Sequence, residues 1–505
     1  MSEYLQVLDY NGRRIPFSAV AEGPYEGAAQ GRRMSIWGTS TAGPNVSLYG
    51  SLKTLRSRTR ELIRNNPLVQ GGNIDSAANA ISSGIFPNWD LDDKVLKQDI
   101  QALWNEFVKK ADYYGVSSLY GLQSLVWFGL LDAGEMLSRK VTRSASLGLP
   151  VPLQIQLLEA DHLDESFNTI SPSNNEIRMG IEFDSDNRRT NYWLWTEHPG
   201  ETFITQRSIC ERRPIPARQI DHMFLPIRAG QQRGRPWLSS IIVKTHDYDQ
   251  YDDAELVRKK GAAMFGGYIE EDVAVTDPAK FFGRPASTDA SERQVIPLEP
   301  GTYPILPKGM KIHYSEPADV GQNYEIYNKQ QLRQMTRGIP GMTYEQFTGD
   351  LSGVNYSSIR AGNLAARRII SFLQKEVIIF QFCQNTAAAF MDAAVLSGAL
   401  KIRDYYGNRE KYLKINWRPD GWPWVDPLKD QLAEQMAVRN GFKSRSQVVA
   451  ENGGDVETVD REIAADNARA DSMGLIYDSD PRRADKSGSI QKAADQAMAA
   501  ATAQN

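Results

Sequence analysis

The chain has 505 residues, a length that suggests roughly three domains. Its 58 Lys and Arg against 62 Asp and Glu give a net charge of −4, which excludes a generally basic coat for nucleic acid but not a local basic patch. The 2 cysteines exclude a disulfide scaffold and a cysteine-built zinc site and fit a reducing compartment, and the 5 scattered histidines offer little for a metal cluster.

The first 49 residues are rich in Gly, Ser, Ala and Arg and show no period, so we expect a flexible N-terminal arm over 1–49. The start of the chain lacks the apolar stretch of a signal peptide. Two charge-free stretches, Tyr113–Leu131 and Val377–Met391, contain polar side chains, and the second is too short to cross a bilayer. They are interpreted as buried helices, and we expect a soluble, cytosolic protein with no membrane partner.

A helical period begins at Leu52, with Leu55 and Leu62 on the same face. Asn66-Pro67 ends this helix. The basic run Lys53–Arg64 on its other face is a candidate nucleic-acid patch, but a solvated helix face is the favoured interpretation. Further helices are predicted around 68–83, 92–112 and 114–140.

The period changes to two after Pro150, where Leu153, Ile155 and Leu157 alternate with polar residues. The β-rich runs 176–183 and 190–197 flank turn-forming residues and predict a hairpin. A further short strand is predicted over His222–Ile227. The pattern therefore indicates a small antiparallel sheet at about 151–228.

Two helices, 237–264 and 319–337, flank a proline-rich insert at 265–318. A glycine-bearing loop, 338–357, follows, and Ser357 is the expected cap of a helix that reaches about residue 397. At about 1.5 Å per residue this helix would extend roughly 60 Å, which is typical of a structural support rather than a globular core.

The chain after this helix returns through a strand at 412–417 and a cluster of Trp and Pro, so that 358–425 forms one unit. A packed Trp/Pro corner around Trp417, Trp422 and Trp424 is favoured over a peptide-binding surface. Helix-start signals at Asp426, Ser444 and Asp455 predict a small helical module over 426–475. The Ala/Gln/Lys-rich tail 476–505 is expected to be disordered or loosely helical.

The sequence carries no recognisable catalytic motif. It has no P-loop, because no Gly-Lys pair is followed by Ser or Thr, and it has no His-Glu-x-x-His pair. The carboxylates at 247–255 fail the EF-hand pattern, since Tyr251 and Asp252 stand where a calcium ligand and glycine are needed. We expect neither an enzyme nor a bound metal or cofactor.

Several runs of residues resemble the lambda family of phage portal proteins, in order over about residues 32–482. The most specific is 348–358, which reads Thr-Gly-Asp-Leu-Ser-Gly-Val-Asn-Tyr-Ser-Ser. The others are Arg60–Pro67, Leu157–His162, Gly234–Leu238, Tyr251–Leu256 and Leu298–Gly301. Each run is weak by itself, and the ordered set is strong.

The resemblance implies an α+β, multi-domain portal fold with wing, stem, clip and crown, and with long structural helices and a small antiparallel sheet. Copies would form a dodecameric ring at one capsid vertex, a conduit for DNA packaging, retention and ejection. Implied partners are double-stranded DNA, the terminase large subunit, a head-tail connector protein, and the major capsid and scaffold proteins. The protein would reside in the virion after assembly in the host cytoplasm.

The resemblance also assigns parts to the chain. The wing would be 50–236 and 358–425, the stem helices 237–264 and 319–337, and the clip 265–318. A tunnel loop, 338–357, would face DNA, and the crown would be 426–475.

A ring repeats every charge on its inner wall once per copy, so a basic wall would bind many phosphates and stall a moving duplex. Acids on the first stem helix suit a wall that repels and centres DNA. We expect the wall-facing candidates to be Asp247, Asp249, Asp252, Asp253 and Glu255. The expected DNA-channel residues are Gly349, Asp350, Ser352, Gly353, Asn355, Tyr356, Arg360, Arg367 and Arg368.

Two other functions remain open from the sequence. A head-tail adaptor without a channel role would be much shorter and would lack the long helix. A phage DNA-processing enzyme subunit, a nuclease or ATPase, would need the Walker or metal-ligand patterns that are missing here.

Overall fold

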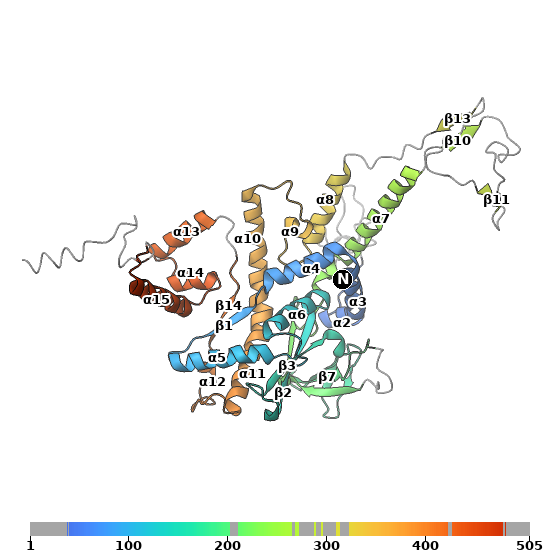
Figure 1. Cartoon of the computed structure of the whole chain (residues 1–505). Helices are drawn as coiled ribbons and strands as arrows, with labels where there is room; N and C mark the ends of the chain where they lie inside the picture. Colours follow the sequence, from blue (N-terminus) through green and yellow to red (C-terminus); the bar gives the residue numbers. More distant parts are fainter. Residues whose placement is uncertain are drawn as a thin grey trace, which may run out of the picture.

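A long helix crosses the middle of the molecule, and two groups of elements leave its body on opposite sides (Figure 1). The computed structural model describes residues 38, 40–201, 211–264, 268–271, 287–288, 294–295, 310–313, 323–422, 427–477 and 480. The architecture is α+β, with long helices and small antiparallel sheets, as the sequence predicts. The first 37 residues, most of the insert 265–318 and most of the tail 476–505 lie outside the described residues.

The N-terminal part of the body is helical and begins inside the predicted arm. Asn66, Asp93 and Ser118 cap the second, third and fourth of the long helices with their side chains. The first two of these helices begin within two residues of the expected starts at 68 and 92, whereas the third begins five residues after the expected 114. The helices are α2 Pro44–Tyr49, α3 Leu52–Asn65, α4 Pro67–Ala80, α5 Lys94–Lys110 and α6 Leu119–Asp132.

The prediction of one helix over 114–140 is wrong. Helix α6 ends at Asp132, and Gly134 follows with a φ of 81°, a left-handed conformation that ends the helix. A Cβ at this glycine would lie 1.9 Å from the backbone carbonyl carbon of Arg235, so the position also needs the absence of a side chain. Strand β2, Glu135–Thr142, then begins at once.

Two small antiparallel sheets occupy the region where the sequence pattern predicts one. The first is three-stranded, with β2 between β3 and β9, and the second is a five-stranded meander, β4 to β8. The predicted hairpin forms between β6 and β7, but the run 176–183 divides into two strands because Met179 and Gly180 both have positive φ. The strands are β3 Leu153–Glu159, β4 Thr169–Ile170, β5 Glu176–Arg178, β6 Ile181–Phe183, β7 Arg189–Trp195, β8 Arg212–Pro216 and β9 Ile220–Phe224.

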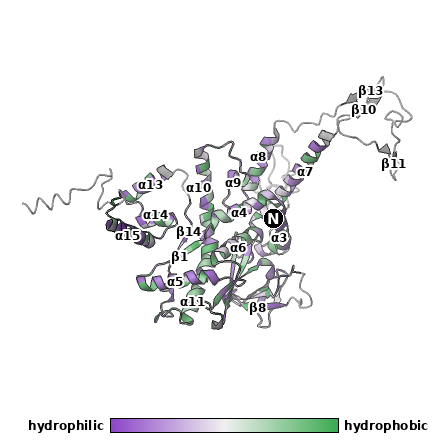
Figure 2. Ribbon diagram, viewed as in Figure 1, coloured by the Kyte–Doolittle hydropathy of each residue, from purple (hydrophilic) through white to green (hydrophobic). Residues whose placement is uncertain are grey.

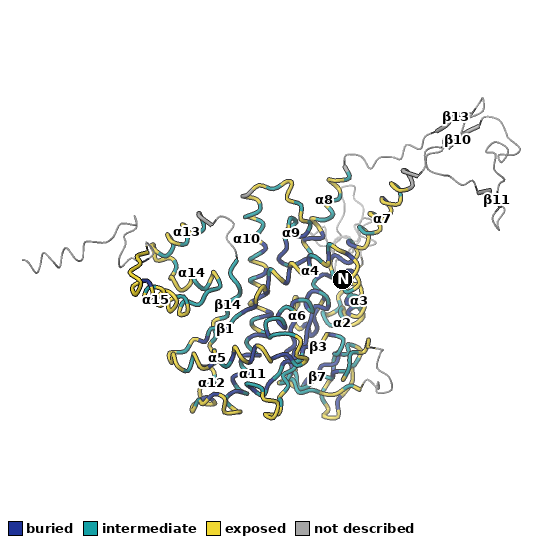
Figure 3. The backbone as a smooth tube through the Cα atoms, viewed as in Figure 1, coloured by how far each residue is buried: buried dark blue, intermediate teal, exposed yellow. Residues whose placement is uncertain are grey.

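The main core lies where α4, α5, α6 and the long helix meet, and it is built around aromatic side chains. Trp89, Trp104 and Trp127 are fully buried. The ring of Trp104 lies edge-on to Phe390 of the long helix, with the centroids 5.0 Å apart. Burial is concentrated in this body and falls away in the C-terminal helices (Figure 3), while hydrophobic and hydrophilic residues are mixed along the helices of both parts (Figure 2).

The two helices predicted to flank the proline-rich insert run side by side and antiparallel away from the body (Figure 1). They are α7, Ile242–Met264, preceded by a 3₁₀ turn at Trp237–Ser240, and α8, Asn323–Thr336. Thr245 donates a hydrogen bond to the sulfur of Met335 near the body, and Tyr251 packs on Tyr324 and Tyr327 further out. Of the insert, four short strands are described, in the pairs β10–β13 and β11–β12: β10 Tyr268–Glu271, β11 Ser287–Thr288, β12 Gln294–Val295 and β13 Met310–His313.

The predicted long helix is present and continuous from residue 356 to 396, but its middle is not α-helical. It consists of α10, Tyr356–Leu373, a π-helical segment, Gln374–Cys383, and α11, Gln384–Leu396. Its cap is Asn355 rather than the expected Ser357, because the Asn355 side chain accepts from the backbone N–H of Ser358.

The chain then returns to the body and continues into a separate helical group. Strand β14, Ile415–Pro419, pairs antiparallel with β1, Ile85–Trp89. It begins three residues later and ends two residues later than the predicted return strand. The capping boxes and caps expected at Ser444 and Asp455 are confirmed, whereas Asp426 lies outside the described residues. The remaining helices are α9 Tyr344–Thr348, α12 Arg409–Tyr412, α13 Pro427–Arg439, α14 Arg445–Glu451 and α15 Val456–Met473. In the described part of the chain, no helix has the length and apolar character to cross a membrane.

Candidate functional site

The loop 338–357 is packed at its base and exposed at its tip. At its base, the left-handed turn at Gly341 lies close against Ile370 of α10. Helix α9 follows, and its Phe347 is buried close to Gly72. The end of the loop, including Gly349, Ser352, Gly353 and Asn355, is exposed to solvent. The side chain of Tyr356 is not among those described.

Asp350 holds the exposed tip together rather than extending from it. Its carboxylate accepts hydrogen bonds from the backbone N–H and hydroxyl of Ser352 and from the Tyr344 hydroxyl, and Lys329 of α8 lies 3.6 Å away. These donors, chiefly Ser352, lower the pKa of Asp350 to about 2. The loop therefore carries an ionised carboxylate that already accepts hydrogen bonds from other residues of the loop.

Asn355 and two of the predicted DNA-binding arginines also have partners within the chain. Asn355 caps α10. The Arg360 guanidinium donates to Asp430 of α13 over 2.6 Å, and Arg367 lies over the ring of Trp422, 5.0 Å from its centroid. Arg368, by contrast, is exposed at the surface of α10. The three arginines predicted as one group thus divide into two that join the long helix to the C-terminal part and one that faces solvent.

The acidic group on α7 divides in a similar way. Asp247 and Asp253 are exposed. Asp249 accepts a hydrogen bond from the Asn66 side chain over 2.7 Å, and Asp252 accepts one from the Tyr324 hydroxyl over 3.2 Å. Glu255 is buried and accepts from Arg258 one turn later over 2.7 Å. The candidates were grouped by sequence position, but the helix turns them toward different neighbours.

The basic run on α3 is not a uniformly solvated face. Arg56 is 2% exposed and donates to Glu165, with Asp161 within 3.5 Å. Arg60 donates to Asp132 and also to Glu159 and Asp161, over 2.8 Å in each of the last two cases. Lys53, Arg58 and Arg64 are exposed. The interpretation as a solvated face is therefore wrong for Arg56 and Arg60, which bind acids from the end of α6 and from the stretch 159–165.

The donor atoms of Glu159, Asp161 and His198 lie within 4.8 Å of one another, close enough for a metal ion. Both carboxylates already accept hydrogen bonds from Arg60. Their charge is therefore compensated within the protein, and the arrangement is an ion-pair cluster.

A fully buried group of charges was not predicted from the sequence. The Glu135 carboxylate accepts from the Arg233 guanidinium, from the backbone N–H of Gly234 and from Nε2 of His222. Arg233 also donates to the backbone carbonyls of Met179, Ala160 and Leu163. The pKa of Glu135 is held well below its usual range, because its burial is outweighed by Arg233 and His222. This group joins β2 and β9 to the meander and to the loop before α7.

The geometry of this buried group suggests no catalytic role for its residues. The Trp/Pro corner is half-buried in its described part, where the Trp417 indole donates to Gln384 over 2.8 Å and Trp422 packs against the core. Trp424 lies outside the described residues. Cys383 is buried, and burial raises the pKa of its thiol.

Comparison with known proteins gives one family and several relatives. The model of the phage portal protein, lambda family, matches residues 30–374. A probable portal protein of Halomonas phage phiHAP-1 is 28% identical over 467 residues, which cover 89% of this chain and 87% of that protein.

Solved structures with similarity to the chain come from gene transfer agent (GTA) particles. The neck of the empty particle, computed with C6 symmetry, gives a TM-score of 0.46 at 14% identity and covers 82% of this chain and 99% of that one. The neck of the native particle, computed with C12 symmetry, gives a TM-score of 0.43 at 15% identity, covering 84% and 97% of the two chains.

Proposed function

Because the chain belongs to the lambda family of phage portal proteins, we propose that its copies close into a ring through which double-stranded DNA is packaged, retained and ejected. The ring is a dodecamer at one capsid vertex in the virion. The observation that carries this proposal is the antiparallel pair α7 and α8, which projects from the body and leads into the insert (Figure 1). Such a pair is a rod that can stand beside its copies and form a wall.

The parts of the chain take the following roles. The wing is 50–236 with 358–425, the stem is 237–264 with 319–337, and the crown is 426–475. The clip, 265–318, docks the terminase large subunit during packaging and the head-tail connector protein afterwards, while the outer surface meets the capsid and scaffold proteins. The roles are structural, and no chemical step is assigned to the chain.

The wall of the channel carries acids on α7. Asp247 and Asp253 are exposed, whereas Asp249 and Glu255 are bound within the chain. A wall that repeats Asp247 and Asp253 in every copy repels the phosphates of the duplex and centres it. DNA then moves without the many simultaneous phosphate contacts that would hold it in place.

The tunnel loop supplies the few contacts that hold DNA at rest. Ser352, Gly353 and Asn355 lie at its exposed tip, and Arg368 lies on the exposed surface of α10. Arg360 and Arg367 instead join α10 to the crown and the return strand. We assign Arg368 the phosphate contact.

The ring is tested by native mass spectrometry and electron microscopy of the purified full-length chain. We expect annular particles of a single subunit number with a central hole. Compact single particles under every assembly condition would overturn the proposal and favour the adaptor alternative.

The phosphate contact is tested by replacing Arg368 with glutamine and measuring DNA retention in assembled particles. We expect Arg368→Gln to lower retention, most strongly at low salt. Arg64→Gln, which removes an exposed arginine on α3, serves as the control and should retain DNA as the wild type does. Equal retention of DNA by both variants would contradict the assignment of Arg368 as a phosphate contact in the channel.

A further inference from the structure

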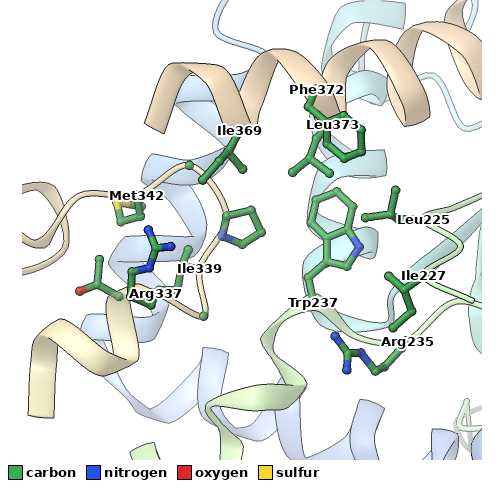
Figure 4. A pocket seen from close by; sticks show the side chains of 14 residues that line it. Leu225, Ile227, Arg235, Trp237, Arg337, Ile339, Met342, Ile369, Phe372 and Leu373 are labelled. Carbon is green, nitrogen blue, oxygen red and sulfur yellow. The ribbon is translucent and has the colours of Figure 1, made fainter. Parts of the chain in front are cut away.

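An apolar cavity opens on the body beside the long helix (Figure 4). Its volume is about 310 Å³. Phe372 and Leu373 of α10 and the indole of Trp237 line its inner side, and the backbone turn 338–342 closes one end. Leu225, Ile227 and Ile369 complete the apolar lining, while Arg235 and Arg337 stand at the edge.

Several of the apolar side chains at this cavity are left in contact with solvent. Phe372 is 52% exposed, Ile227 is 56% exposed and Ile369 is 38% exposed. Apolar groups that gather around a concave surface indicate a binding site more strongly than the same groups scattered over a surface. These side chains therefore offer an apolar surface that a further apolar group can cover.

The described part of the N-terminal chain is fixed directly beside one wall of this cavity. The Arg228 guanidinium donates to the carbonyl of Ala42 over 3.3 Å. The Asn45 side chain donates to the carbonyl of Gly230 over 3.0 Å and accepts from the backbone N–H of Gln232 over 2.9 Å. The segment that carries Leu225 and Ile227 is thus the same segment that holds residues 42–45.

Residues 34–37, which read Met-Ser-Ile-Trp, immediately precede this anchored stretch. Trp37 is five residues before Ala42, a length of chain that reaches about 17 Å when extended. The four residues also lie inside the part of the chain that the family model matches, which begins at residue 30.

We propose that the cavity is the docking site for the segment Met34–Trp37 of the same chain, with the Trp37 indole as its main occupant. An indole ring and a neighbouring isoleucine match an apolar cavity of this size. The edge guanidinium groups of Arg235 and Arg337 can lie over the face of an indole, a contact that a purely aliphatic occupant would not offer. The proposal concerns the body of one subunit and is independent of ring formation.

The first experiment places cysteines on both sides of the proposed contact. In full-length protein with Cys210→Ser, the pair Ser35→Cys and Arg337→Cys is oxidised and analysed under denaturing conditions. Cys383 can stay, because it is buried and its thiol pKa is raised. We expect an internal disulfide that leaves the product at monomer mass and removes two free thiols.

The matched control moves the first cysteine to Ser18 of the same N-terminal region and keeps Arg337→Cys. It should form at least tenfold less internal disulfide. Equal yields from the two pairs would overturn the proposal. Covalent dimers in place of the internal product would show that the segment comes from a neighbouring copy, and this outcome would also overturn docking within one chain.

The second experiment tests the occupant by thermal unfolding of full-length variants. Trp37→Ala should lower the melting temperature by on the order of 2 °C or more, since an indole leaves an apolar site. Tyr25→Ala removes an aromatic ring from the same region outside the docking segment and should leave the melting temperature unchanged. Equal melting temperatures for the wild type and both variants would overturn the role of Trp37.

Discussion

Three donors converge on the buried carboxylate of Glu135, namely Arg233, His222 and the backbone N–H of Gly234. Arg233 is itself fully buried, so its charge is balanced chiefly by this one carboxylate. A buried pair of this kind adds little net stability when it is intact, but removal of one partner leaves the other charge without compensation. Glu135 therefore controls whether the two sheets and the loop before α7 can pack together.

We expect Glu135→Gln to lower the free energy of unfolding by about 3–5 kcal/mol. Urea unfolding monitored by circular dichroism measures this change. Glu159→Gln is the matched control, because Glu159 is a more exposed carboxylate in the neighbouring cluster and its loss should cost less than about 1 kcal/mol. Similar losses for the two variants would contradict the account of the buried group.

His222 makes the stability of this region depend on pH. Burial lowers its pKa from 6.5 to about 4. The unfolded chain therefore binds more protons between these pH values, so the contribution of neutral His222 is complete above pH 6.5 and is lost as the pH falls through 4. Asp132 acts in the opposite direction, because burial raises its pKa from 3.8 to about 6 and its contribution to stability is lost as the pH rises through 6.

We expect His222→Gln to weaken the loss of stability between pH 7 and pH 4 by up to about 3 kcal/mol relative to the wild type. Asp132→Asn should have the reverse effect and steepen the loss. Urea unfolding at several pH values across this range measures both slopes. A wild-type slope in the His222 variant would mean that the imidazole is not held neutral in the fold.

At the scale of elements, the start of the long helix shows how closely sequence signals can be read. The pattern predicts a cap near residue 357, and the structure assigns it to Asn355, with Ser357 donating its hydroxyl to the Asn355 side chain. Both residues are good caps, so composition alone does not separate them. The hydrogen bond to the Ser358 backbone decides the assignment.

We expect Asn355→Ala to lower the free energy of unfolding by about 1 kcal/mol and to speed hydrogen exchange in the first turn of α10. Ser357→Ala should change each quantity by much less, because it removes only a supporting hydroxyl. Hydrogen exchange followed by mass spectrometry measures the two variants side by side. A larger effect from Ser357→Ala would contradict this assignment and show that Ser357 is the cap.

Helix and turn signals located most elements because those signals are local. The pattern failed at β2, since the apolar Met136 and Leu137 follow the helix closely and only the backbone of Gly134, pressed against Arg235, separates helix from strand. The sequence pattern also failed to predict which charged side chains pair with one another. Arg360 and Asp430 are 70 residues apart, and Arg60 binds acids about 70 to 100 residues away, which no local spacing can reveal.

At the scale of the whole molecule, the proposed ring would repeat each wall residue once per subunit. A double change of Asp247→Lys and Asp253→Lys would then replace an acidic wall with a basic one. Every added phosphate contact steepens the dependence of binding on salt. The effect is therefore expected on DNA movement rather than on folding of the single chain.

We expect particles with the double change to release DNA more slowly at low salt and to approach the wild-type rate at high salt. The rate of ejection across a salt series measures this dependence. Glu61→Lys, which adds a positive charge on the exposed surface of α3, is the control and should keep the wild-type salt dependence. Identical salt curves for the wall variant and the wild type would place α7 away from the lumen.

The number of residues in the π-helical segment Gln374–Cys383 sets how α10 is rotated relative to α11. Each residue of an α-helix turns it by about 100° and advances it by about 1.5 Å. Deleting one residue from this segment would rotate α10 against α11 by that amount. Arg360 would then face away from Asp430 and Arg367 away from Trp422, while Phe390 stayed in the core. We therefore expect insertions and deletions within this helix to break these contacts, whereas substitutions on its exposed face remain compatible with the fold.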